Sequence, residues 1–372
     1  MGTRSSGVTA ASERGNRLFR FLDIWAGTPL GAVCGITRRR RAGPPPAIKR
    51  IGLLRTAAIG DTVLLSGPVA DLRQSFPESS ITLFCGGSNL EVARLVPGLD
   101  DVVRLPIARP WKAMGIVRRA GAFDAWIDFG QWPRYDALIS HCARAAFKVG
   151  FRTPGQRRHY VFDRCAAHTT DRHEIENFRA LTAMLGASGS SLPRLAVPEG
   201  ELPLSPGSVV FHMFPGGSRA AVKAWPAERW VELGSRVAGD GRRIVLTGSV
   251  RDRPGAEAVA AQMPHGAATV AAGELDIAAT ARLLTGCAAV VSVDTGIMHI
   301  ASALGCRLVA LHGPTSAKRW GPLNPTSTAV QSAYSREPWI QLGFEGPRAG
   351  DACMRCITVD QVHDALDRVL SA

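Results

Sequence analysis

Four polar clusters interrupt this 372-residue chain, each where an apolar, strand-like run gives way to a helical pattern. In the first, RTAAIGD at 55–61, Gly60 allows close backbone approach and Asp61 stands at or near a helix N-cap. The residues alone leave two interpretations of Asp61 open, a functional carboxylate and a plain helix cap. The pattern GxGxxG is absent here, which argues against a dinucleotide-dependent oxidoreductase.

The second cluster, FPGGSRAAVKAWP at 214–226, has the chemistry of a phosphate-binding loop. The turn at Gly217 and Ser218 exposes backbone N–H groups, and Lys223 adds a mobile positive charge just before a helix. The Walker pattern GxxxxGK(S/T) is not matched. A plain surface loop is the alternative interpretation.

The third cluster, Asp294, Thr295 and Gly296, marks a bend between a strand and a helix with an apolar stripe. Packing of that stripe would fix the start of the helix, where free N–H groups favour an anion by about 0.3–2 kcal/mol. His299 lies off the stripe, so it either faces a ligand or has a structural role.

The fourth cluster, HGPTS at 312–316, adds a turn of hydroxyl groups, Thr315 among them, beside two basic residues. No two aspartates have the D-x-D spacing that commonly holds the metal ion of a sugar-nucleotide enzyme. Positive side chains and helix ends must then neutralise a bound diphosphate. The CxxC of Cys353 and Cys356 lacks a second pair at zinc spacing, so we expect neither a metal nor a cofactor.

Strands and helices alternate in the two halves of the chain, which predicts a mostly parallel sheet in each half. The expected fold class is α/β, with two doubly wound, Rossmann-like domains that face a cleft and bind ligands beyond the carboxyl ends of their strands. The predicted divisions are an N-terminal extension, a first domain, a linker, a second domain and a C-terminal segment, at 1–47, 48–190, 191–206, 207–345 and 346–372.

Net charge and its distribution limit the classes of partner. The chain carries a net charge of +13, but residues 1–50 hold ten basic and two acidic residues. That surplus of eight leaves only +5 for the other 322 residues. A nucleic-acid partner is therefore not expected, since such proteins concentrate positive charge on the folded body.

The N-terminal extension has the features of a segment that lies on a membrane surface. Leu18, Phe21, Leu22 and Trp25 share one helical face, and an arginine cluster follows at 38–41. The uncharged stretch between them is too short to span a bilayer. The alternatives are a disordered tail and a helix docked on the protein itself.

Together the four clusters resemble glycosyltransferase family 9, the heptosyltransferases of lipopolysaccharide assembly. The family's Arg followed by Ile-Gly-Asp is matched at 55–61, and its Pro-Gly-(small)-Ser…Lys-x-Trp-Pro at 215–226. Its Asp-Thr-Gly-x-x-His-x-Ala-x-Ala-x-Gly is matched at 294–305, and its Gly-Pro-Thr at 313–315. The resemblance covers 48–370 and leaves out the N-terminal extension.

The resemblance implies a GT-B fold and inverting, metal-independent transfer of heptose from an ADP-heptose donor to a lipopolysaccharide core or related glycolipid. The first domain would bind the acceptor and the second the nucleotide sugar, while the last helix would pack back on the first domain. The eight cysteines are scattered and a chain of this size needs no disulfide framework, which favours a reducing cytoplasm. We therefore expect a cytoplasmic enzyme, peripheral on the inner face of the bacterial inner membrane, where the N-terminal extension would make contact.

Carried over residue by residue, the resemblance makes Asp61 the general base that takes the proton of the acceptor hydroxyl. Two alternatives stay open, a GT-B transferase that uses another nucleotide sugar and a non-catalytic, membrane-associated binding protein. The implied substrate contacts are Gly60, Gly217, Ser218, Lys223, Asp252, Asp294, Thr295, Gly296, His299 and Thr315.

Overall fold

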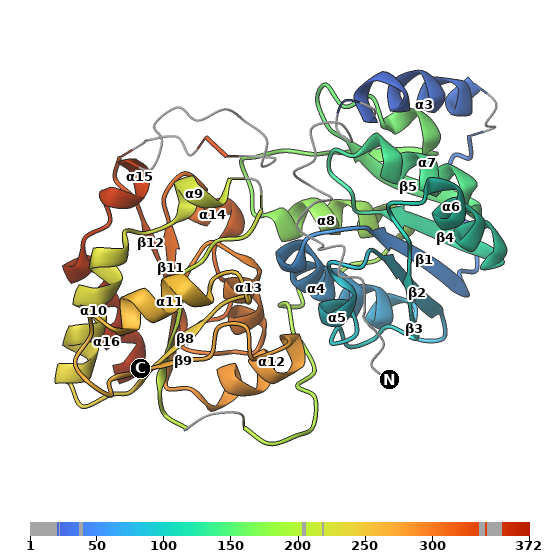
Figure 1. Ribbon diagram of the computed structural model, residues 1–372. Coiled ribbons are helices and arrows are strands. Elements are labelled where there is room, and N and C mark those ends of the chain that lie inside the picture. Colours follow the sequence, from blue (N-terminus) through green and yellow to red (C-terminus); the bar gives the residue numbers. More distant parts are fainter. Residues whose placement is uncertain are drawn as a thin grey trace, which may run out of the picture.

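The computed structural model describes residues 21, 23–36, 40–202, 206–217, 219–334, 339–340 and 352–372. It contains two six-stranded parallel sheets (Figure 1). The strand order in the first sheet is β3-β2-β1-β4-β5-β6. Read from the corresponding edge, the order in the second sheet is β9-β8-β7-β10-β11-β12. Both halves thus repeat one doubly wound order, which confirms the α/β class.

The N-terminal domain places helices on both faces of its sheet. One face packs under α4, α5 and α8, and the other under α6 and α7. Its elements are β1 (Arg50–Arg55), α4 (Ile59–Ser75), β2 (Ser80–Cys85), α5 (Leu90–Ala93), β3 (Asp101–Arg104), α6 (Pro110–Arg119), β4 (Ala122–Asp128), α7 (Arg134–Cys142), β5 (Arg144–Arg152), η1 (His159–Val161), β6 (Arg164–Ala167), α8 (Glu174–Thr182) and η2 (Ala183–Leu185).

The C-terminal domain has the same layers, with α10, α11 and α16 on one face of the sheet and α12 and α13 on the other. Its elements are β7 (Val209–His212), α9 (Ala220–Lys223), α10 (Ala227–Gly239), β8 (Ile244–Thr247), α11 (Arg253–Ala260), β9 (Ala268–Val270), α12 (Ile277–Gly286), β10 (Ala289–Val293), α13 (Gly296–Ala303), β11 (Leu308–His312), α14 (Ala317–Trp320), β12 (Ser327–Gln331), α15 (Ala352–Arg355) and α16 (Val359–Ser371).

The last helix corrects one expectation. α16 packs against β10, β11, β12 and α10 of its own domain, far from the N-terminal sheet (Figure 1). Its apolar stripe, including Val362, Leu366 and Val369, is buried in the core cluster of the C-terminal domain. The expectation that this helix packs back on the first domain is therefore wrong, because the stripe is already covered by the second sheet.

The two domains share a continuous apolar cluster. It joins α4 and α5 of the first domain to α12 and α13 of the second, and it includes Val63 and Leu64 of α4 as well as Met298 and Ile300 of α13. The interface between the domains is therefore apolar, as the core of a single domain is. Each Å² of apolar surface that it removes from water stabilises the contact by about 25 cal/mol. The carboxyl edges of both sheets meet along this cluster.

α3 (Gly27–Ile36) lies against α7 and η1 of the N-terminal domain. Asp23, just before it, is buried and accepts hydrogen bonds from the backbone N–H groups of Arg134 and Tyr135 and from the Arg134 side chain. No helix in the described part of the chain is long and apolar enough to cross a membrane. The arginines at 38 and 39, like Leu18 and Leu22, lie outside the described residues.

Candidate active site

Asp61 lies in the first turn of α4 and is buried, with 7% of its surface exposed. Arg55, at the end of β1, pairs with one carboxylate oxygen at 2.9 Å, and Gln131 donates to the other at 2.6 Å. The turn that delivers α4 is strained, since Ala58 has a φ of 77°. Such a conformation costs a non-glycine residue about 1–2 kcal/mol and is typical of functional sites.

A second buried carboxylate, that of Glu174, is connected to Asp61 through Gln131. Gln131, three residues beyond β4, also donates to Glu174 at 3.0 Å. Glu174 lies at the start of α8 and contacts His168 at 2.8 Å and Arg319 at 2.9 Å. Burial works to raise the pKa of Glu174, but His168, Arg319 and Gln131 outweigh it and lower that pKa to about 2. The pair with Arg319 joins the two domains.

Asp294 follows β10 in the C-terminal domain and is 8% exposed. Lys223 donates to its backbone carbonyl at 3.0 Å and stands 4.0 Å from its carboxylate. Burial works to raise the pKa of Asp294, but the charges of Lys223, His312 and His299 and a hydrogen bond from Thr315 hold it below its usual value. The group is therefore an ionised carboxylate at neutral pH.

His299 of α13 lies where the turns that carry the two carboxylates approach each other, with its ring packed against Gly60. The charges of Asp294 and Asp61 both act on His299, although burial prevails and lowers its pKa to about 4. A Cβ on Gly60 would lie 2.5 Å from a His299 ring carbon, and a Cβ on Gly296 would lie 2.7 Å from that of Ile59. Both glycines are thus required by the close approach of α4 and α13.

The other residues named from the sequence lie at the carboxyl edge of the second sheet. Thr295 stands at the N-cap of α13 in extended conformation, and Thr315 contacts His312 at 3.3 Å. Gly217 has a φ of 88°, which requires glycine. Asp252 accepts from the backbone and hydroxyl of Ser249 at 2.8 and 2.7 Å.

Ser218 lies outside the described residues, so its predicted role stays a prediction. Gln131 and Glu174 were missed from the sequence. Gln131 follows a strand, as the four clusters do, and that position was the available signal. Glu174 opens a polar helix and offered no such signal, because its partners come from distant parts of the chain.

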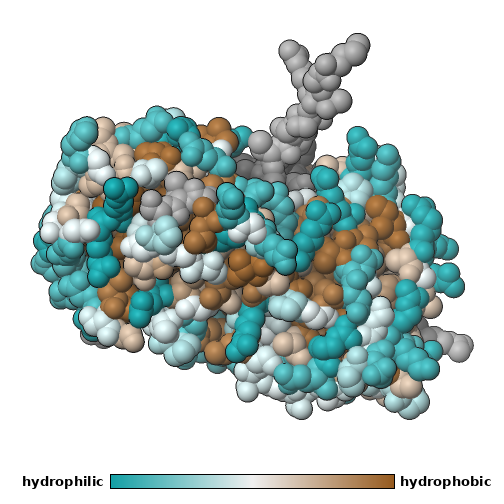
Figure 2. Space-filling view, turned by 90° about the horizontal axis from the view of Figure 1, so that it is seen from below, coloured by the Kyte–Doolittle hydropathy of each residue, from teal (hydrophilic) through white to brown (hydrophobic). Residues whose placement is uncertain are grey.

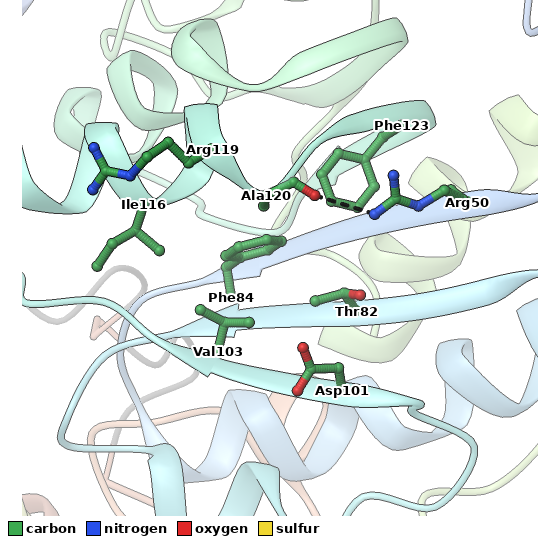
Figure 3. A pocket seen from close by; sticks show the side chains of 9 residues that line it. All are labelled: Arg50, Thr82, Phe84, Asp101, Val103, Ile116, Arg119, Ala120 and Phe123. Carbon is green, nitrogen blue, oxygen red and sulfur yellow. Dashed lines mark hydrogen bonds between the residues drawn. The ribbon is translucent and has the colours of Figure 1, made fainter.

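Two other features lie away from these carboxylates. A pocket of about 360 Å³ is at the amino edge of the first sheet, where Arg50 donates to the carbonyl of Ala120 (Figure 3). Among the described residues, Asp240, His363 and Asp367 could together hold a metal ion on the surface between α10 and α16. Because α10 runs away from the carboxyl edge, this group is remote from Asp294.

Comparison with known proteins decides the family. The model of glycosyltransferase family 9 (heptosyltransferase) matches residues 118–341. Lipopolysaccharide heptosyltransferase 2 of Escherichia coli K12 is 32% identical over 327 residues, or 79% of this chain and 89% of that protein. The chain belongs to glycosyltransferase family 9. Like other members it is a glycosyltransferase, as the four sequence clusters indicated.

Solved structures agree with this family 9 assignment at the level of fold. The E. coli ADP-heptose lipopolysaccharide heptosyltransferase II matches with a TM-score of 0.70 at 21% identity, over 87% of this chain and 99% of that one. E. coli heptosyltransferase WaaC with ADP matches with a TM-score of 0.67 at 22% identity, over 86% and 99%. The GT-B architecture is thereby confirmed.

Proposed function

We propose that this family 9 transferase moves a heptose from ADP-heptose to a lipopolysaccharide core or related glycolipid, with inversion and without a metal ion. The relatives in E. coli and Salmonella typhimurium are named lipopolysaccharide heptosyltransferase 2. E. coli WaaC, a fold neighbour, was solved with ADP-2-deoxy-2-fluoro heptose. The observation that carries the proposal is the contact between the two carboxylate-bearing turns across the domain interface: Gly60, next to Asp61, packs against His299 of α13, the helix that begins just after Asp294.

In the proposed step the acceptor oxygen attacks the anomeric carbon of the donor. The bond from that carbon to the diphosphate breaks, its electron pair leaves with ADP, and Asp61 takes the hydroxyl proton. A single displacement of this kind inverts the configuration. A positioned base is worth about 10²–10⁴-fold in rate.

The second domain would stabilise the leaving diphosphate. Lys223 brings a cation to the start of α13, whose N–H groups favour negative charge. In this proposal Asp294 and Thr295 hold the sugar diphosphate, and the turn at Gly217 and Ser218 contacts the phosphates. The remaining contacts are assigned to Gly60, Asp252, Gly296, His299 and Thr315.

Product analysis tests the proposal. The purified protein is incubated with ADP-heptose and a heptose-deficient lipopolysaccharide, and mass spectrometry should show the acceptor gaining one heptose residue. NMR of the product should show the inverted anomer, and a chelator should leave the rate unchanged. Failure with ADP-heptose but transfer from a UDP- or GDP-sugar would overturn the donor assignment. No transfer from any donor, with nucleotide binding retained, would support the binding-protein alternative.

The N-terminal extension is the proposed contact with the inner face of the bacterial inner membrane. Its described part exposes apolar side chains although Asp23 anchors it to the N-terminal domain. Trp25 is 68% exposed and Ile36 84%, and Arg40 and Arg41 follow. Helix α3 lies at the top of the molecule in Figure 1. Figure 2 shows the opposite face, seen from below, where apolar residues are interspersed with polar ones. Inserting one such side chain into a bilayer contributes about 1.5–3 kcal/mol.

Vesicle flotation tests this contact. The parent protein should float with vesicles that contain phosphatidylglycerol and less with pure phosphatidylcholine, since anionic lipid attracts the arginines. Trp25→Ser should weaken flotation, whereas the matched control Trp111→Ser should not, because Trp111 is equally exposed but lies on α6. Equal flotation of both variants would contradict the proposal.

A further inference from the structure

Gln131 uses all of its hydrogen-bonding groups to join two buried carboxylates. Its amide nitrogen donates to Asp61 at 2.6 Å and to Glu174 at 3.0 Å, and its oxygen accepts from both terminal nitrogens of Arg55 at 3.2 Å. An ionised carboxylate only accepts and a guanidinium only donates. These partners therefore allow a single orientation of the Gln131 amide.

Glu174 connects this amide to the other domain. Arg319, on α14, donates through Nε at 3.1 Å and Nη2 at 2.9 Å to one oxygen of Glu174. The two side chains are 1% and 0% exposed. Removing one partner of such a buried pair is strongly destabilising, because it leaves the other charge buried without its partner. Because the partners come from different domains, the pair is complete only while the domains are together.

We infer that Gln131 is a positioning residue for Asp61, and that the Arg319–Glu174 pair makes this positioning depend on domain closure. The inference rests on the proposed function, in which Asp61 is the base. Arg55 and Gln131 hold one oxygen each of the carboxylate, so its plane is fixed. A misplacement of about 1 Å at a reacting group can cost about 10²-fold in rate.

Several charged or titratable groups surround Asp61 and enter any pH profile. Arg55 faces it from β1, and His299 from α13. Glu174 and His168 stand behind Gln131, and His173 at the N-cap of α8 acts on His299. Gln131 itself carries no charge, so Gln131→Met removes its hydrogen bonds but keeps every one of these charged or titratable groups, which makes it the cleanest probe.

The first experiment compares Gln131→Met and Gln131→Glu with the parent protein. For Gln131→Met we expect kcat to fall about 10–100-fold with the donor KM little changed, since the carboxylate loses its alignment. Loss of a donated hydrogen bond favours the protonated acid, so the acidic limb of the pH–rate profile should move to higher pH. Gln131→Glu should move it further, because it adds a negative charge. Gln262→Met, on the surface, is the matched control.

The second experiment tests the link between domains. Arg319→Met removes the guanidinium from Glu174 and leaves its buried charge to His168 and Gln131. We expect a loss of about tenfold or more in kcat with the same shift of the acidic limb. The double variant Arg319→Met/Glu174→Gln removes both charges and should recover much of that loss. If circular dichroism shows that Arg319→Met does not fold, the variant Arg319→Lys, which keeps the charge, is measured in place of Arg319→Met.

The outcomes separate this inference from the proposed function. Full activity of Asp61→Asn would remove Asp61 as the base, and the inference with it. An inactive Asp61→Asn beside a folded Gln131→Met with parental kcat and pH profile would overturn only the positioning role. A double variant no more active than Arg319→Met would overturn the dependence on domain closure.

Discussion

The two buried carboxylates differ in how completely they are supported. Asp61, on the N-terminal side, has a guanidinium on one oxygen and an amide on the other. Asp294, on the C-terminal side, has the Lys223 ammonium 4.0 Å from its carboxylate, and the neighbouring His312 has a buried ring nitrogen with no hydrogen-bond partner among the residues that the structure describes. Both carboxylates lie where a strand passes into a helix, so the difference comes from their neighbours.

This difference separates two kinds of site. A satisfied buried network holds its members rigid, whereas an unpaired buried polar group costs about 1–3 kcal/mol and in a native structure calls for an explanation. We infer that the N-terminal side is organised before substrate arrives, and that the C-terminal side is completed by the nucleotide sugar. Substitutions on the two sides should then change different kinetic constants.

The largest expected effect is that of Asp61→Asn. The variant keeps the shape of the carboxylate but cannot take a proton, so kcat should fall by about 10²–10⁴-fold. Calorimetry should show nearly unchanged binding of ADP, because the nucleotide is assigned to the other domain. Weakened binding of ADP by Asp61→Asn would contradict the assignment of the base and the nucleotide to different domains.

Lys223→Met should act on the C-terminal side with a smaller effect. The variant removes the cation that contacts Asp294, and we expect kcat/KM to fall about 10–100-fold, with a higher donor KM. Steady-state kinetics at varied donor concentration measures this. The control is Lys112→Met on α6, which should behave as the parent protein. An unchanged donor KM would place Lys223 outside the donor site.

Gly296→Ala tests the contact between the two sides. The new Cβ would lie 2.7 Å from that of Ile59 on α4, so the domains must separate slightly. We expect the free energy of unfolding to fall by about 1–3 kcal/mol, as for other overpacked sites. Urea unfolding measures it. Gly239→Ala has open space around the new Cβ and is the control; equal stability of both variants would contradict the tight approach.

The smallest effect concerns pH. Burial lowers the pKa of His212 to about 4, as it does for His299, below the unfolded value of about 6.5. Between these pH values the unfolded chain binds more protons, so stability is full above about pH 6.5 and falls as pH drops toward 4. His212→Phe should reduce that fall by about 1–2 kcal/mol, measured by urea unfolding at pH 5 and 7. An unchanged slope would contradict the buried neutral state.

The strand ends could be read from the sequence because they depend on local patterns. Apolar runs and helix starts placed Asp61 and Asp294 correctly at the carboxyl edges of two sheets. The sequence did not reveal β5, β6, β9 and β12. In β5, charged residues such as Arg144 and Lys148 interrupt the expected apolar run. Lys148 is nonetheless buried, with its ammonium group donating to the carbonyl of His141.

The contacts across domains could not be read in this way. Gln131, Glu174 and Arg319 come from three separate segments, and no spacing along the chain relates them. The position of α16 could not be predicted either. Its apolar stripe indicates that one face of the helix is buried, but the stripe does not indicate which of the two sheets covers it. Tertiary packing, and not local pattern, decides both.

The placement of α16 in its own domain has a practical consequence. Because this helix does not return to the first sheet, the described chain passes between the domains once, from η2 to β7. Two polypeptides, divided in that segment, would each keep a whole sheet with its covering helices. We expect such halves to associate through α4 and α13 when produced together, which makes this enzyme a scaffold for a split reporter.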